Sequence, residues 1–349
     1  MNAIPQPEAR RLKNGSFQLR WPGNPWRFCK EEDARPFLPF DYGYTPFPSP
    51  QQRAEERRKE AIASLASEIS SDISLGEVRK VYQLPYQGLA LVFSDSVANR
   101  KIDPNDWIYQ KRGRRFISLS IAPLEDLESP FKGSGARARA EIVACDRSCH
   151  YLSHGAIAHH GRELPASRKG KSIAAGGSQC YVAWNQIRAP INSAKRDPSR
   201  VPYLSLGRET LWRLTSWGDL SVLPYEIVDA LVSGIESRGG WGSRDKGDQV
   251  LSYSNAWREG SSASPLVRER LKGRAMASVS TIIEFAEATE AGWTPFYSDN
   301  EGDDHKPLDL FKLHGQKVIP CLATADNENS CARCRVCSGN KFGAYVPSH

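Results

Sequence analysis

The chain of 349 residues is long enough to bury one large core or two smaller ones, and 40% hydrophobic with 25% charged residues is an ordinary globular composition. Its sequence contains no apolar run of the length that a membrane helix needs, and the first residues, MNAIPQPEARRLKNG, lack the apolar core of a secretory signal. We therefore expect a cytoplasmic protein without membrane contact, in which thiols stay reduced and serve as metal ligands more often than as disulfides.

The net charge of +7 is compatible with a nucleic-acid or nucleotide partner. The charge is spread along the chain, and its densest cluster comprises Lys111, Arg112, Arg114 and Arg115. A solvated basic surface explains such a distribution equally well, so both interpretations stay open.

Residues 1–50 are rich in proline and aromatic residues. Proline removes backbone donors and interrupts helices, so the composition predicts an irregular extension, and its aromatic residues give it something to bury. Cys29 lies in this extension far from any other thiol in the sequence, which favours a structural cysteine over a ligand.

Beyond this extension, hydrophobic periodicity predicts alternating strands and helices. Helices are expected over 49–72, 223–237, 262–273 and 281–292. Strands are expected over 81–93, 114–123, 138–144, 249–257, 274–280, 293–298 and 311–321, and within 203–219. This alternation indicates an α/β fold with a parallel sheet or partial barrel, in which functional residues gather where the strands end.

The last cysteine group has the pattern C-x9-C-x2-C-x2-C and comprises Cys321, Cys331, Cys334 and Cys337. A tight loop that supplies three thiolates, with a fourth from elsewhere, is what a [4Fe–4S] cluster needs. Zinc is the alternative, because four thiolates also form a closed structural site. Zinc sites commonly use two separate C-x2-C pairs, so the overlapping spacing favours iron–sulfur.

An earlier group comprises Cys145, Cys149 and Cys180. Three thiolates leave one coordination position open, which is what a site that binds a substrate or cofactor needs. Histidines in the polar segment between Cys149 and Cys180 offer a fourth ligand, and the candidates are His150, His154, His159 and His160. For each of these histidines, a solvated loop residue is the alternative interpretation.

Several motifs resemble an uncharacterised family of phage- and plasmid-borne proteins, the gene-product-88-like group. They are C-D-R-S-C…C-Y-V, R-L-T-S-W-G-D, Y-S-N-A-W, M-A-S-V-S, A-E-A-T-E-A-G-W and I-P-C-L-A…C-A-R-C-R-V-C, within residues 140–345. That family in turn is similar to divergent radical S-adenosylmethionine enzymes, in which a C-x3-C-x2-C loop after the first strand of a partial (βα)6 barrel holds a [4Fe–4S] cluster. Thirty residues separate Cys149 from Cys180, where radical enzymes have two.

The resemblance implies roles for particular residues. Cys145, Cys149 and Cys180 would bind the first cluster, and the four tail cysteines an auxiliary one. Asp219 would be the catalytic residue and orient the methionyl ammonium of S-adenosylmethionine. The implied cofactor-binding residues are Ser216, Trp217, Gly218, Asp219, Ser252, Ser254, Asn255, Ser278 and Ser280.

These observations predict a domain organisation and a function. We expect an N-terminal part over 1–110, a radical-type partial α/β barrel over 111–315, and a cysteine-rich metal-binding tail over 316–349. The resemblance favours an iron–sulfur enzyme with an electron donor and a nucleotide, nucleic-acid or protein substrate, in the host cytoplasm if it is carried by a phage or plasmid. The alternative is a non-catalytic zinc or iron–sulfur protein of a mobile element that binds nucleic acid or a protein partner.

Overall fold

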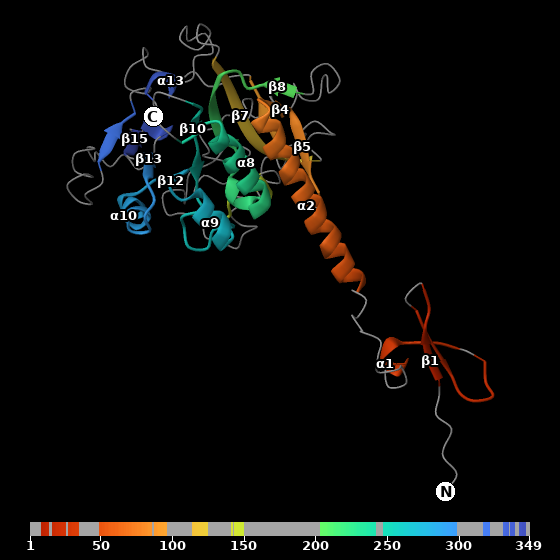
Figure 1. The fold of residues 1–349 in the computed structure, drawn as a ribbon. Coiled ribbons are helices and arrows are strands. Elements are labelled where there is room, and N and C mark those ends of the chain that lie inside the picture. The colour runs from red at the N-terminus through yellow and green to blue at the C-terminus, as the bar shows by residue number, and fades with distance from the viewer. Residues whose placement is uncertain are drawn as a thin grey trace, which may run out of the picture. The chain divides into compact units, whose positions relative to one another are not determined.

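The computed structural model describes fourteen stretches of the chain. They are residues 8–13, 16–25, 27–34, 49–85, 87–95, 114–124, 141, 143–149, 203–241, 247–298, 317–321, 331–334, 336–338 and 342–346. The chain divides into two compact units, Met1–Arg57 and Arg58–His349 (Figure 1). Within the described stretches, no helix is long and apolar enough to cross a membrane.

The N-terminal unit contains a three-stranded antiparallel sheet of β1 (Glu8–Arg11), β2 (Phe17–Arg20) and β3 (Arg27–Cys29), followed by the short helix α1 (Glu31–Ala34). The expectation of an irregular extension was therefore wrong for these residues. Pro22 and Pro25 lie between β2 and β3, where a missing N–H group does not interrupt the strand pairing.

The second unit contains a five-stranded sheet in the order β10-β9-β7-β6-β5. Its strands are β5 (Val81–Leu84), β6 (Leu89–Ser94), β7 (Arg114–Pro123), β9 (Glu209–Trp217) and β10 (Gln249–Leu251). Strands β7, β9 and β10 are parallel, whereas β5, β6 and β7 pair antiparallel. The single strand expected over 81–93 is a hairpin, because the segment between β5 and β6 contains Pro85 and Gly88.

A second sheet is entirely parallel and has the order β11-β12-β13-β15-β14. Its strands are β11 (Tyr253–Ser254), β12 (Met276–Val279), β13 (Pro295–Ser298), β14 (Val318–Pro320) and β15 (Gly343–Val346). Only Ser252 separates β10 from β11, so the two sheets join there.

The two sheets of the second unit draw on segments that are far apart in the sequence. Strands β5 and β6 precede residue 110 and share a sheet with β7, and the two compact units meet between Arg57 and Arg58. The cysteine-rich tail contributes β14 and β15 to the second sheet. Strands β4 (Glu77–Arg79) and β8 (Tyr203–Ser205) form a separate antiparallel pair. The expectation of an α/β fold with parallel strands is confirmed.

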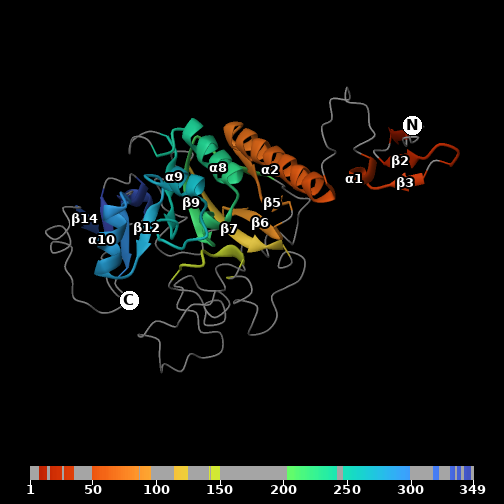
Figure 2. The same cartoon turned by 90° about the horizontal axis from the view of Figure 1, so that it is seen from below.

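Helices α2 (Pro50–Ser74), α8 (Tyr225–Ser237) and α9 (Pro265–Leu271) lie along the sheet on one side (Figure 2), and α10 (Ile282–Glu290) connects β12 to β13. Their positions match the predicted helices. The Ser264 hydroxyl caps α9 by accepting from the Val267 N–H group at 3.3 Å. A side chain at Gly234 of α8 would lie 3.1 Å from Ile73 Cβ, so α2 and α8 pack closely.

The strand expected over 138–144 is wrong for residues 141, 143 and 144, which are the ones that the structure describes. Glu141, Val143 and Ala144 have helical backbone, and the Cys145 N–H group donates to the Glu141 carbonyl at 3.1 Å. This hydrogen bond between residues four apart is the α-helical one.

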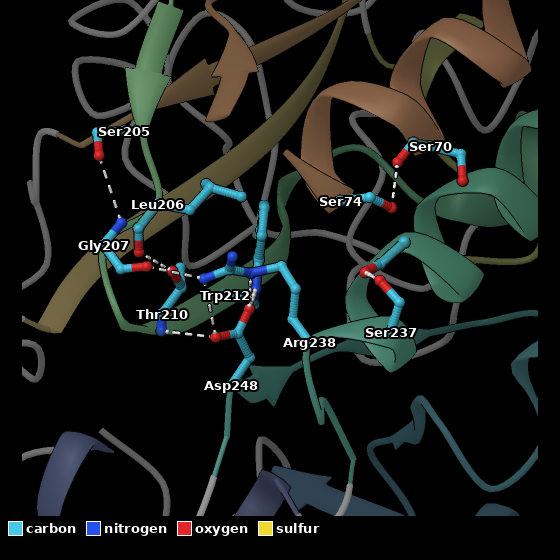
Figure 3. A network of polar contacts seen from close by, with 11 residues as sticks. Ser70, Ser74, Ser205, Leu206, Gly207, Thr210, Trp212, Ser237, Arg238 and Asp248 are labelled. Carbon is cyan, nitrogen blue, oxygen red and sulfur yellow. Dashed lines mark hydrogen bonds and ion pairs between the residues drawn. The ribbon is translucent and has the colours of Figure 1, made fainter. Parts of the chain in front are cut away.

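Figure 3 shows a buried network at the start of β9 and β10. The carboxylate of Asp248, a residue 1% exposed, accepts from the Thr210 N–H group at 2.9 Å and from Trp212 Nε1 at 2.8 Å. Arg238 Nε donates to the same carboxylate at 2.8 Å, and Arg238 Nη2 donates to the Gly207 carbonyl at 3.0 Å. One carboxylate thus joins β9, β10 and the end of α8.

We expect Asp248→Ala to lower the free energy of unfolding by about 3–5 kcal/mol, because it leaves the Arg238 charge buried without its partner. The matched control is Asp229→Ala, which removes an ion pair with Arg270 from a side chain that is 41% exposed. That variant should lose about 1 kcal/mol or less. Urea unfolding monitored by tryptophan fluorescence measures the free energy of unfolding of both variants. Equal decreases in the two variants would contradict the structural role of Asp248.

Candidate functional site

The carboxyl ends of the parallel strands β9, β11 and β12 carry several of the predicted site residues. Gly218 and Asp219 follow β9, Asn255 follows β11, and Ser280 follows β12. The Asp219 N–H group donates to the Ala144 carbonyl at 2.9 Å, which brings the segment of Cys145 to the end of β9. This agrees with the general tendency of α/β proteins to place functional groups at the carboxyl ends of their strands.

The loop Cys145–Cys149 is organised by the fully buried carboxylate of Asp146. One carboxylate oxygen accepts from the Ser148 N–H group at 2.7 Å and from the Ser148 hydroxyl at 2.6 Å. The other accepts from the Ser261 hydroxyl at 2.7 Å and from the Ser262 N–H group at 3.0 Å. These bonds fix the loop that carries both cysteines against a segment more than a hundred residues away.

The neighbouring residue, Arg147, strengthens the same attachment. Its Nε donates to the Gly260 carbonyl at 2.6 Å, and its backbone N–H group donates to the Ser262 hydroxyl at 3.2 Å. The Cys145–Cys149 loop is therefore held by two consecutive side chains, one acidic and one basic.

The carboxylate of Asp219 is buried and uses both of its oxygens within the chain. One oxygen accepts from the Ser221 N–H group at 3.0 Å and from the Ser254 hydroxyl at 2.7 Å. The other accepts from the Asn255 N–H group at 2.7 Å. Asp219 thus joins the ends of β9 and β11, which is the geometry of a positioning residue; its predicted contact with a cofactor stays a prediction.

The two carboxylates differ in their protonation behaviour. Burial, and then the negative charge of Asp146, raise the pKa of Asp219 to about 6 from 3.8. Burial alone would also raise the pKa of Asp146, but hydrogen bonds from donors that include Ser148 and Ser261 outweigh it and lower that pKa. Asp146 therefore carries the negative charge first, and Asp219 ionises at higher pH.

The end of β9 has an irregular backbone. Ser118 pairs with Arg213 and Ser120 pairs with Trp217, so β9 bulges between these positions. Thr215, in the bulge, has φ 61°, which is unfavourable for a β-branched residue, and its hydroxyl donates to the Tyr253 carbonyl at 3.0 Å. Bulges of this kind occur next to functional sites, where they redirect the chain.

Gly218 is required where β9 meets the Cys145 loop. Its φ is +83°, and a Cβ atom there would lie 2.8 Å from both the Ala144 carbonyl oxygen and Ile121 Cβ. A side chain is excluded by backbone conformation and by space at the same time.

The remaining predicted cofactor residues have varied surroundings. The Ser280 hydroxyl donates to Glu284 at 3.0 Å, and the Ser278 carbonyl accepts from Trp257 Nε1 at 3.1 Å. The Ser252 hydroxyl is buried and has no hydrogen-bond partner among the described residues, while Ser216 contacts its own strand at the Arg213 carbonyl. Trp217 is buried in the core.

The four tail cysteines act on one another electrostatically. Burial, and then the neighbouring thiols of Cys331, Cys321 and Cys334, raise the pKa of Cys337 to about 12. The Tyr253 hydroxyl forms a hydrogen bond with the Cys337 side chain, and this bond lowers the pKa of Cys337. Cys321, Cys331 and Cys334 therefore lie within electrostatic range of Cys337, which contacts Tyr253 of β11.

Two of the tail cysteines make hydrophobic contacts with the sheet. Cys331 and Cys337 pack against the buried side chains of Leu211 in β9 and Leu251 in β10, together with Phe116 of β7. The short helix α13 (Cys331–Cys334) and the 3-10 turn η4 (Val336–Ser338) carry three of the cysteines between β14 and β15. Cys321 directly follows β14, and its N–H group donates to the Tyr345 carbonyl at 2.7 Å.

The seven cysteines in the described stretches form no disulfide bonds with one another. Within those stretches, no three side chains of His, Cys, Asp or Glu lie in an arrangement that would hold a metal ion. Cys180 and the four histidines between Cys149 and Cys180 lie outside the described residues. The role of these cysteines as metal ligands stays a prediction.

Three important residues of this region were not identified from the sequence. Asp146 and Arg147 lie inside the C-D-R-S-C motif, where an acidic and a basic residue between two cysteines were an available signal. Tyr253 begins the Y-S-N motif, but its contact with Cys337 joins distant parts of the chain and has no local pattern.

Comparison with known proteins gives no relative. No protein-family model, curated protein sequence or solved structure matches the chain. The resemblance to the gene-product-88-like group therefore stays a prediction.

We expect Gly218→Ala to lower the free energy of unfolding by about 3 kcal/mol, because it combines backbone strain with overpacking against Ala144 and Ile121. The control is Gly273→Ala, where φ is +73° but no atom lies within 4 Å of the added Cβ. It should lose only about 1 kcal/mol from backbone strain. Chemical denaturation measures the free energy of unfolding of both variants. Equal decreases in the two variants would contradict the close packing of Gly218 against Ala144 and Ile121.

Proposed function

We propose that the chain is an iron–sulfur metalloprotein and that Cys321, Cys331, Cys334 and Cys337 bind a cluster against the parallel sheet. The observation that carries the proposal is that Cys331 and Cys337 pack on the same hydrophobic cluster of the sheet, with Cys321 and Cys334 within electrostatic range of Cys337. Reduced thiols that are gathered in this way are suited to a soft metal. We place the protein in the cytoplasm, where such thiols stay reduced.

The electrostatics of the four thiols supports a cation at this position. Without a metal, each thiolate would repel the others, which contributes to the raised pKa of Cys337. A bound metal ion reverses this effect, because coordination deprotonates thiols and releases their protons. The donor set consists of sulfur alone, which suits both iron–sulfur clusters and zinc.

The finer proposal is a radical-type enzyme built on a partial (βα)6 barrel. The parallel neighbours β7, β9 and β10, and then β11, β12 and β13, follow the chain order of that architecture, whereas β15 and then β14 lie beyond β13 in reversed order. The pair Cys145 and Cys149 follows β7, the first of these strands, and together with Cys180 would supply three ligands to a second [4Fe–4S] cluster. When bound there, such a cluster supplies the electron for reductive cleavage of S-adenosylmethionine.

In this proposal the chain's own residues position and shield the site. Asp146 and Arg147 hold the Cys145–Cys149 loop in place through their bonds to 260–262. Asp219 fixes the ends of β9 and β11, so we assign it a positioning role rather than direct contact with the methionyl ammonium. Arg258 and Glu284 form an ion pair that joins the loop after β11 to α10.

The metal proposal is tested by comparing Cys334→Ala with Cys29→Ala in anaerobically purified protein. We expect Cys334→Ala to lower metal affinity at least about tenfold, as loss of one of four ligands should exceed the loss seen for outer-sphere substitutions. It should also lower Tm, because bound metal stabilises the folded state. Cys29, on β3 of the N-terminal unit, should be replaceable without change in either quantity. Mass spectrometry measures the iron and zinc content of both variants. Unchanged metal content in Cys334→Ala would contradict the proposal.

The radical proposal has a separate test. We expect the reduced protein to convert S-adenosylmethionine to 5′-deoxyadenosine. The Cys149→Ala variant should lose this activity. The Cys334→Ala variant, where it still folds, should retain the first cluster. Chromatography of the products measures the conversion. A protein that binds iron and sulfide but forms no 5′-deoxyadenosine would support the non-catalytic alternative instead.

A further inference from the structure

One face of the N-terminal sheet carries a polar and aromatic row across all three strands. Arg10 of β1 pairs with Gln18 of β2, and Gln18 pairs with Phe28 of β3. Residues that pair directly across strands point to the same face of a sheet. Arg10 Nε and Nη2 donate to Gln18 Oε1 at 3.1 and 2.9 Å, so the guanidinium group lies along this face.

The other face of the sheet is the packed one. Phe17, which neighbours Gln18 and therefore points the opposite way, is 6% exposed, and Ala34 of α1 is fully buried. Phe28 is 69% exposed, so the sheet presents a large aromatic ring on the face that it does not use for its own packing. A second aromatic side chain, Trp21, is 51% exposed in the turn after β2.

The charge of this sheet is strongly positive. Residues 8–30 contain one acidic residue, Glu8, and six basic residues, which are Arg10, Arg11, Lys13, Arg20, Arg27 and Lys30. Glu8 and Arg20 form an ion pair at 2.5 Å in the next row of the face that carries Phe28. The three strands and their turns therefore hold five more positive than negative charges, whereas Glu31, Glu32 and Asp33 of α1 directly after them lower the excess of residues 8–34 to two.

We propose that this face, defined by Arg10, Gln18, Arg20 and Phe28, binds single-stranded nucleic acid. An exposed aromatic ring on an open sheet stacks on an unpaired base, and arginine side chains beside it contact phosphates. The Gln18 amide, between the arginine and the ring, can hydrogen-bond a base edge. Bases inside a duplex are already stacked on each other and do not offer a free face to Phe28, so the geometry favours single strands. This inference does not depend on the metal site.

The test is fluorescence anisotropy of a labelled twelve-nucleotide oligothymidylate with the full-length protein, compared with a duplex of equal length. We expect tighter binding of the single strand and an affinity that falls as salt rises, because phosphate contacts release counterions. Phe28→Leu keeps an apolar side chain but removes the ring, and should weaken binding by about tenfold, the effect of losing one stacked base. Phe28→Trp should retain the affinity.

Two further variants sharpen the outcome. Arg10→Ala should reduce the slope of log affinity against log salt by about 0.7, the contribution of one phosphate contact on a single strand. Ile283→Ala removes a side chain that is 71% exposed on α10 of the second unit and should leave binding unchanged. Absence of binding at low salt, equal affinity for duplex and single strand, or full affinity in Phe28→Leu would each overturn the proposal. Full affinity in that variant would indicate an apolar protein contact instead.

Discussion

The buried carboxylate of Asp219 is the interaction on which the candidate site depends. It lies between the ends of two parallel strands and accepts hydrogen bonds from Ser221, Ser254 and Asn255. Burial of a charge costs free energy unless hydrogen bonds replace the lost hydration, and here the chain supplies donors to both oxygens. The nearby negative charge of Asp146 adds to that cost, so the two acids are held together only because the surrounding loops provide so many donors.

Buried carboxylates lie at both ends of the parallel strands, but their hydrogen-bond partners differ. At the starts of β9 and β10, Asp248 is matched by the positive charge of Arg238, which gives a closed and neutral arrangement. At the opposite ends, the carboxylates of Asp146 and Asp219 are instead matched by uncharged hydrogen-bond donors, which are hydroxyl and backbone N–H groups.

Much of the fold could be predicted from the sequence because its signals are local. Helices α8, α9 and α10 follow from apolar periodicity, and the Ser264 cap with Pro265 sets the start of α9. The hairpin of β5 and β6 was missed because its apolar pattern continues across Pro85 and Gly88, and the N-terminal strands were missed because prolines in the turns masked them. The gathering of Cys145 with Asp219 was anticipated only through a resemblance, and no local pattern contains the contacts of Asp146 with Ser261 or of Tyr253 with Cys337. Such contacts depend on how distant loops meet once the sheet has formed.

X-ray absorption of the anaerobically purified protein tests most directly whether the tail cysteines bind an iron–sulfur cluster. Metal K-edge spectra identify both the element and its neighbours in one measurement. We expect iron surrounded by sulfur, with scattering from a second iron atom. Zinc surrounded by four sulfur atoms, or protein that folds without any bound metal, would contradict this expectation.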